Sequence, residues 1–140
     1  MNADMEQVPG FLFFDHVAIS VKPGELESNV KAYQAMGFKE VHREDVLGGD
    51  QVREVLLQVG GGPNLVQLLE PLNAASPVAK LLEKNGGRGG LAHVALRVAD
   101  IQNQESMICA TLSSAGRCCA ASKKTDLIML LMPSRLMSGT

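Results

Sequence analysis

The sequence lacks an excess of basic charge, a long apolar run and a C-x-x-C cysteine motif. Its 13 Lys and Arg residues are outnumbered by 15 Asp and Glu residues, and the net charge is -2 at pH 7. A protein that binds nucleic acid needs a concentrated basic surface, so we expect no nucleic-acid partner. No apolar run approaches the roughly 20 residues that a membrane-spanning helix requires, so we expect no membrane association.

The features of secreted proteins are also missing. The first residues are acidic and lack the basic and apolar regions of a signal peptide. The three cysteines are Cys109, Cys118 and Cys119. An odd number of cysteines without a signal peptide indicates reduced thiols, so the sequence predicts a cytoplasmic protein.

The sequence does contain a short motif that occurs twice. Residues 14–21 read FDHVAISV and residues 91–98 read LAHVALRV, which places His16 and His93 77 residues apart. Each motif alternates like a strand. A repeat at half the chain length predicts two copies of one structural unit, with both histidines facing a shared site. The alternative is a coincidence between two core strands whose histidines are ordinary hydrogen-bonded residues.

Apolar spacing and turn residues predict a β-α-β-β-β order in the first half. The expected elements are strands over residues 13–21, 38–43, 51–59 and 64–70 and a helix over 25–36, which Gly37 caps. After these, Ser76 and Pro77 predict the N-cap and first residue of a short helix. We expect this helix to bury Val78, Leu81 and Leu82.

The order begins again in the second half and then degrades. A strand over 91–98 and a weak helix over 101–112 are followed by one recognisable strand over 127–132, and no aromatic residue occurs from Gln102 onward. We therefore predict an α+β fold of paired βαβββ modules, the second incomplete, in a single domain over 1–140. The expected parts are a first module over 11–72, a linker with a short helix over 73–90, and a second module over 91–140 whose tail diverges from about 102.

Four polar side chains occupy strand positions that alternation assigns to a protected face. They are His16, Glu54, Gln67 and His93. Two neutral imidazoles and an amide oxygen suit a divalent ion such as Co²⁺, Mn²⁺ or Zn²⁺. A carboxylate on such a face has a raised pKa unless a cation lies beside it.

Simpler interpretations of these residues stay open. Gln67 could face solvent, and Glu54 could be an edge-strand carboxylate paired with Arg43 or Arg53. His42 lies in a charged stretch, and we expect it to face solvent. The repeat makes one further prediction: Gln67 follows His16 by 51 residues, so its counterpart after His93 falls near position 144, beyond the last residue.

These residues lie in segments that resemble the methylmalonyl-CoA epimerase family of the vicinal oxygen chelate (glyoxalase-like) superfamily. The segments are FDHVA at 14–18, VREV at 52–55, VQLLEPL at 66–72, SPVAKLLEKN at 76–85 and LAHVA at 91–95. They cover about residues 13–101 in order. The run from PL to SPVAKLLEKN is the part most typical of the epimerases.

The resemblance implies an enzyme that interconverts (R)- and (S)-methylmalonyl-CoA by moving the α-proton. His16, Gln67, His93 and a glutamate from the last strand would hold the divalent metal, which chelates the substrate carboxylate and thioester carbonyl. Glu54 matches the general base on one face of the α-carbon, and the last-strand glutamate acts from the other face. Members of the family usually dimerise, so the resemblance also implies a homodimer.

The chain departs from the family after residue 101. The family's HPK and GGVLxEL motifs are absent, and the only acids after Asp100 are Glu105 and Asp126, neither at the right spacing. We therefore expect exchange of the α-proton with solvent but poor epimerisation. Two alternatives stay open: a non-catalytic small-molecule binding module of the same fold, and an inactive truncated form with an unpaired sheet edge.

Overall fold

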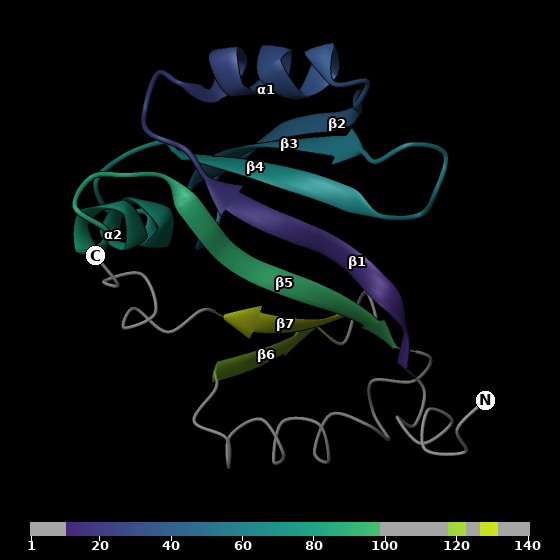
Figure 1. The fold of residues 1–140 in the computed structure, drawn as a ribbon. Coiled ribbons are helices and arrows are strands. Elements are labelled where there is room, and N and C mark those ends of the chain that lie inside the picture. The colour runs from purple at the N-terminus through teal and green to yellow at the C-terminus, as the bar shows by residue number, and fades with distance from the viewer. Residues whose placement is uncertain (1–10, 99–117, 123–126, 132–140) are drawn as a thin grey trace.

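The structure, a computed structural model, describes residues 11–98, 118–122 and 127–131 (Figure 1). Its strands are β1 (Phe11–Ser20), β2 (Lys39–Val46), β3 (Val52–Gln58), β4 (Leu65–Pro71), β5 (Gly90–Val98), β6 (Cys118–Ser122) and β7 (Leu127–Leu131). Its helices are α1 (Leu26–Ala35) and α2 (Pro77–Lys84). No helix among these residues is both long and apolar enough to cross a membrane.

The described strands form one mixed sheet in the order β2-β3-β4-β1-β5-β7-β6. β1 runs parallel to β4 on one side and antiparallel to β5 on the other. The two strands that carry the repeated motif therefore lie side by side, as Figure 1 shows in purple and green. β7 pairs antiparallel with the other side of β5.

Helix α1 covers one face of the first half of the sheet (Figure 1). Its apolar positions Leu26 and Val30 are buried, and they pack with Val55, Leu57 and Leu68 of the strands beneath. Tyr33, the next apolar position on this side, is partly buried against the same cluster. Gly37 follows the helix with a left-handed φ of 96°, which confirms the predicted glycine cap.

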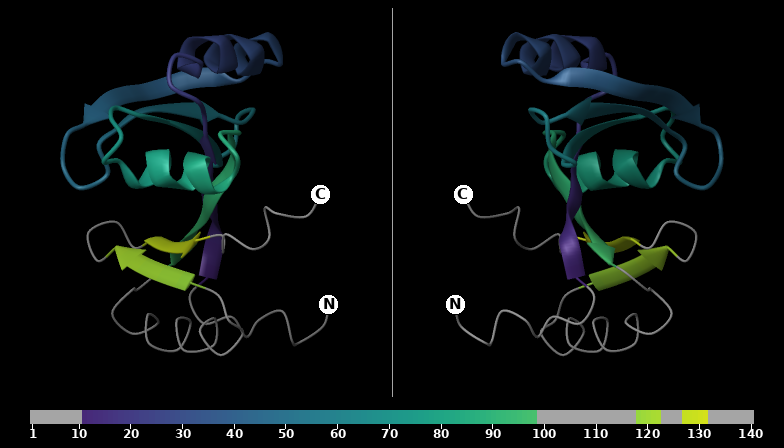
Figure 2. Two further views of the ribbon diagram at one scale, coloured as in Figure 1. Left: turned by 90° about the vertical axis from the view of Figure 1, so that its left-hand side faces the viewer. Right: turned by 90° about the vertical axis from the view of Figure 1, so that its right-hand side faces the viewer.

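Helix α2 packs on the other face, inside the curl of the sheet (Figure 2). Ser76 accepts a hydrogen bond from the backbone N–H of Val78, and Pro77 is the first helical residue, as predicted. Val78 and Leu82 are buried, whereas Leu81 is only half-buried. The helix closes one end of this inner face.

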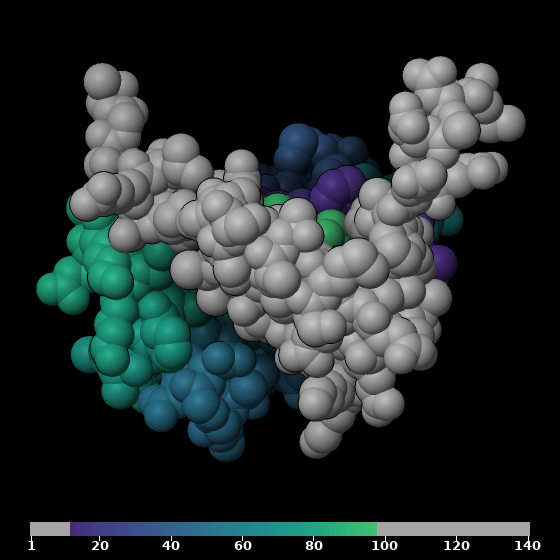
Figure 3. Space-filling view, turned by 90° about the horizontal axis from the view of Figure 1, so that it is seen from below, coloured from purple at the N-terminus to yellow at the C-terminus, as the bar shows by residue number. Residues whose placement is uncertain are grey.

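The loop between β2 and β3 lies against the start of α2. The Ser76 hydroxyl donates to the carbonyl oxygen of Asp50 at 2.8 Å, and Asn73 donates to Gln51. Figure 3 shows the blue β2–β3 segment and the teal α2 segment meeting on the side opposite α1. These bonds fix the hairpin that carries Glu54 relative to the helix.

Two differences from the sequence predictions concern strands. β2 continues to Val46 rather than ending at Arg43, and β6 was not predicted at all. The expected helix over 101–112 lies outside the described residues. The α+β class and the order β1-α1-β2-β3-β4 of the first half are as predicted.

Candidate functional site

The predicted metal ligands surround one small residue at the centre of the sheet. Ala18 of β1 pairs with Gln67 of β4 and with His93 of β5. Paired residues on neighbouring strands share a face, so Gln67 and His93 flank Ala18, and His16, two residues earlier on β1, lies on the same face. Ala18 is fully buried and carries only a methyl group, so three longer polar side chains surround a short one.

The two histidines are in direct contact. The Nε2 atom of His16 lies 3.0 Å from the Nε2 atom of His93, and the rings meet edge to face. Burial, followed by the neighbouring His16, lowers the pKa of His93 to about 4. His93 is therefore neutral at pH 7, which is the form of imidazole that binds a metal.

The carboxylate of Asp15 contacts His16 on the Nδ1 side of its ring. Nδ1 of His16 lies 2.8 Å from Asp15, and Arg97 donates to the other oxygen of Asp15 at 2.7 Å. Burial raises the pKa of Asp15, but the hydrogen bonds from His16 and Arg97 outweigh it and hold this pKa below its ordinary value. A carboxylate accepting the Nδ1 proton leaves the lone pair of Nε2 directed at the site.

A β-bulge in β1 allows the adjacent residues Asp15 and His16 to contact each other. Phe14 pairs with Leu96 and His16 pairs with Ala95, so two steps along β1 match one step along β5. Asp15 is the extra residue of the bulge. Asp15 and His16 are both buried, at 8% and 9% exposed, although regular alternation places consecutive side chains on opposite faces.

Gln67 links the ligand group to the predicted base. Its Nε2 donates to Glu54, while its Oε1 is buried and has no hydrogen-bond partner in the described part of the chain. Leaving such an oxygen unpaired costs about 1–3 kcal/mol, and a bound cation would remove that cost. Two imidazole nitrogens and this amide oxygen therefore fit a divalent ion such as Co²⁺, Mn²⁺ or Zn²⁺.

The environment of Glu54 is that of a shielded acid. Its side chain is 14% exposed. Burial raises the pKa of Glu54, and the neighbouring Glu44 raises it further. The alternative that Glu54 pairs with Arg43 or Arg53 is wrong.

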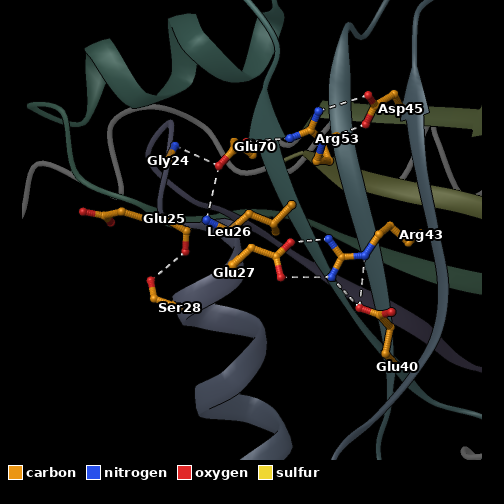
Figure 4. A network of polar contacts seen from close by, with 10 residues as sticks. All are labelled: Gly24, Glu25, Leu26, Glu27, Ser28, Glu40, Arg43, Asp45, Arg53 and Glu70. Carbon is orange, nitrogen blue, oxygen red and sulfur yellow. Dashed lines mark hydrogen bonds and ion pairs between the residues drawn. The ribbon is translucent and has the colours of Figure 1, made fainter.

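Both arginines have other partners (Figure 4). Arg53 binds Asp45 and lies 3.9 Å from Glu70. Arg43 binds Glu27 and Glu40. The acid on the inner face is thus left without a neutralising arginine from these two positions.

The sequence interpretation gave no role to Asp15, Arg97 or Glu44, and it placed His42 only in solvent. His42 is exposed, as predicted, but its Nε2 lies 3.8 Å from Glu54 and 3.3 Å from Glu44. The ligand atoms of His42, Glu44 and Glu54 all lie within 4.8 Å of one another. The sequence signals were weak: Asp15 precedes a ligand candidate, and His42 and Glu44 are two residues apart on one strand.

The chain is similar to a large family and to several solved structures. Residues 15–116 match the family model described as Glyoxalase/Bleomycin resistance protein/Dioxygenase superfamily. Methylmalonyl-CoA epimerase from Mycobacterium tuberculosis superposes with a TM-score of 0.68 at 28% identity, over 97% of this chain and 86% of that chain. No curated protein sequence matches the chain.

Two similar structures contain bound acyl-CoA compounds. A methylmalonyl-CoA epimerase in complex with methylmalonyl-CoA and NH4+ has a TM-score of 0.59 at 32% identity, over 78% of this chain and 73% of that chain. A variant of Streptomyces coelicolor methylmalonyl-CoA epimerase in complex with 2-nitronate-propionyl-CoA has a TM-score of 0.65 at 29% identity, over 90% of this chain and 91% of that chain.

Proposed function

Because the chain belongs to the glyoxalase/bleomycin resistance protein/dioxygenase superfamily, we propose that it moves the α-proton of methylmalonyl-CoA and so interconverts the (R) and (S) forms. The observation that carries the proposal is the bond between Gln67 and Glu54. This bond joins a shielded acid to the amide of Gln67, which lies in the same row of the sheet as His93. The buried oxygen of that amide has no hydrogen-bond partner among the described residues.

Each residue has a separate task in this proposal. His16, Gln67 and His93 hold a divalent ion. When bound, such an ion would supply positive charge to the thioester carbonyl oxygen, where negative charge develops as the α-proton leaves. Glu54 is the general base, and its raised pKa suits a group that must take up a proton and keep it long enough to return it.

The proposal assigns one base, Glu54, to one face of the α-carbon. Epimerisation needs a second proton donor on the opposite face of the α-carbon. We propose that this chain therefore exchanges the α-proton with solvent faster than it inverts the carbon. The homodimer, the cytoplasmic location and the division into two modules are further proposals that rest on the sequence.

Ion binding is the first test of this function. The purified chain is treated with a chelator and titrated with Co²⁺, Mn²⁺ and Zn²⁺ in a calorimeter. We expect one ion per chain, and Gln67→Ala weakens the binding because it removes the amide oxygen. The matched control is Gln58→Ala, which removes an amide on β3 that bonds to the carbonyl of Gly62 instead. Equal ion binding by both variants contradicts the assignment of Gln67.

Label exchange is the second test. Methylmalonyl-CoA with deuterium at the α-carbon is incubated with the ion-loaded chain in water, and mass spectrometry follows loss of the label. We expect label loss from the unsubstituted chain, and Glu54→Gln abolishes it while ion binding is kept. No label loss with any of the three ions rules out the proposed reaction.

A further inference from the structure

A second β-bulge determines which face of the sheet His42 occupies. Lys39 pairs with Gln58 and Glu40 with Leu57, but His42 pairs with Leu56. Val41 is therefore an extra residue in β2. Without this bulge the register would place His42 opposite Val55, which belongs to the core beneath α1.

Because of the bulge, His42 lies in the row of paired strand residues that crosses the candidate site. Leu56 pairs with Gln67 on its other side, so His42, Leu56 and Gln67 share one face. The next pairs move Glu44 opposite Glu54 on that same face. Bulges at sheet edges and beside active sites often redirect a side chain in this way.

His42 is a more exposed neighbour of Glu54. Its side chain is 45% exposed, whereas that of Glu54 is 14% exposed. Nε2 of His42 is 3.8 Å from one oxygen of Glu54, and the other oxygen of Glu54 accepts from Gln67. Glu44, on the same strand, lies 3.3 Å from Nε2 of His42.

We propose that His42 relays the proton between Glu54 and solvent during exchange of the substrate α-proton. This inference rests on the proposed function and names the route that connects its base to water. Glu44 is a positioning residue that holds the imidazole over Glu54. Gln67, which donates to the other oxygen of Glu54, cannot relay a proton because an amide does not titrate in water.

The relay balances without any further reactant. The substrate C–H bond breaks as Glu54 gains an O–H bond, and the electron pair stays on the substrate. The O–H bond of Glu54 then breaks as Nε2 of His42 gains a proton, and the imidazolium releases one N–H proton to water. Imidazole suits this task because one ring nitrogen can take up a proton while the other releases one. Catalytic hydrogen bonds are often long before substrate binds, so a 3.8 Å separation is compatible with this transfer.

The test measures label loss from α-deuterated methylmalonyl-CoA by the ion-loaded chain. We expect His42→Gln to slow label loss by about tenfold or more with KM unchanged, since a proton relay acts on the transfer and not on binding. Added imidazole restores the rate of this variant in proportion to its concentration, an effect that a misfolded protein would not give. The control is Lys39→Gln, an exposed change on the same strand that leaves label loss unchanged.

A second measurement needs no ion and no turnover. In the metal-free chain, the NMR signals of the His42 imidazole shift when Glu54 is changed to Gln, because the two side chains are neighbours. Label loss by His42→Gln at the unsubstituted rate overturns the relay alone. Absence of label loss from the unsubstituted chain overturns the proposed reaction, and the relay with it.

Discussion

At the scale of single residues, Asp15 fixes the orientation of the His16 ring. The carboxylate accepts from Nδ1 of His16 and from Arg97, and both partners stabilise its charged form. Carboxylates behind metal-binding histidines keep the ligand nitrogen deprotonated and the ring in place. We therefore expect Asp15 to contribute to ion binding at the proposed site without touching the ion.

We expect Asp15→Asn to weaken ion binding by about 10- to 100-fold, the effect usual for the loss of such a partner. Calorimetric titration of the variant and the unsubstituted chain measures this change. An unaltered affinity would falsify the role of Asp15.

The same variant gives a pH test in the metal-free chain. The pKa of Asp15 is lower in the folded chain than its ordinary 3.8, so its stabilisation is fully present above 3.8 and is lost as the pH falls through the folded pKa. The unsubstituted chain should be more stable than Asp15→Asn at pH 7, and this gap should close as the pH falls below 3.8. Thermal unfolding at several pH values measures it, and a gap that is constant with pH contradicts the assignment.

Residue types and spacing were enough to predict the ligand candidates but not their polar neighbours. His16, Gln67 and His93 were assigned to one face because alternation holds around Ala18 and its partners. Asp15 and His42 each lie at or next to a β-bulge, which the pairing of two distant strands determines. No local pattern in the sequence marks the extra residue of a bulge. Asp15 and His42 were therefore not predicted as neighbours of the site.

At the scale of elements, Glu70 connects β4 to the start of α1. One oxygen of Glu70 accepts from the backbone N–H groups of Gly24 and Leu26 at 2.9 and 3.2 Å (Figure 4). The N-cap residue itself, Glu25, makes no side-chain cap. A carboxylate from a neighbouring strand thus satisfies a free donor at the helix start and interacts favourably with its dipole.

We expect Glu70→Ala to lower the free energy of unfolding by about 1–3 kcal/mol, because the buried N–H group of Leu26 loses its acceptor. Denaturant unfolding followed by circular dichroism measures the change. The control is Glu27→Ala in the same helix, which removes an exposed ion pair with Arg43 and should cost about 1 kcal/mol or less. Equal losses in the two variants contradict the capping role.

The sequence predicted helices more completely than strands for a physical reason. The caps of α1 and α2 are local, and Gly37, Ser76 and Pro77 encode them directly. The end of β2 and the existence of β6 depend on partner strands instead. The charged stretch of β2 carries little apolar alternation, yet it extends to Val46 because β3 offers hydrogen bonds along its length.

At the scale of the whole molecule, the two halves pair their strands differently. Beside β1 the sheet has the parallel strand β4, whereas beside β5 it has the antiparallel strand β7. Gln67 pairs with Ala18, which is two residues after His16. The equivalent position two residues after His93 is Ala95.

In the described sheet, Met129 of β7 pairs with Ala95. Spacing in the sequence had placed the counterpart of Gln67 near position 144, because it assumed that both halves keep the same strand order. The register thus identifies Met129 as the described residue at the position where the repeat expects a fourth ligand.

We expect Met129→Glu to convert exchange into inversion, because it adds a carboxyl group, which can act as both acid and base, at the register position that pairs with Ala95. Relative to label loss, the rate of (R)-to-(S) conversion should rise by about 100-fold or more, the usual contribution of a positioned general acid or base. Conversion is followed by chiral analysis of the acyl-CoA while mass spectrometry follows the label. Met129→Gln is the matched control, since it offers an amide ligand but no base and should leave the ratio unchanged. If Met129→Glu binds the ion and unfolds cooperatively yet leaves the ratio as it was, the pairing of Ala95 with Met129 does not mark the second catalytic position.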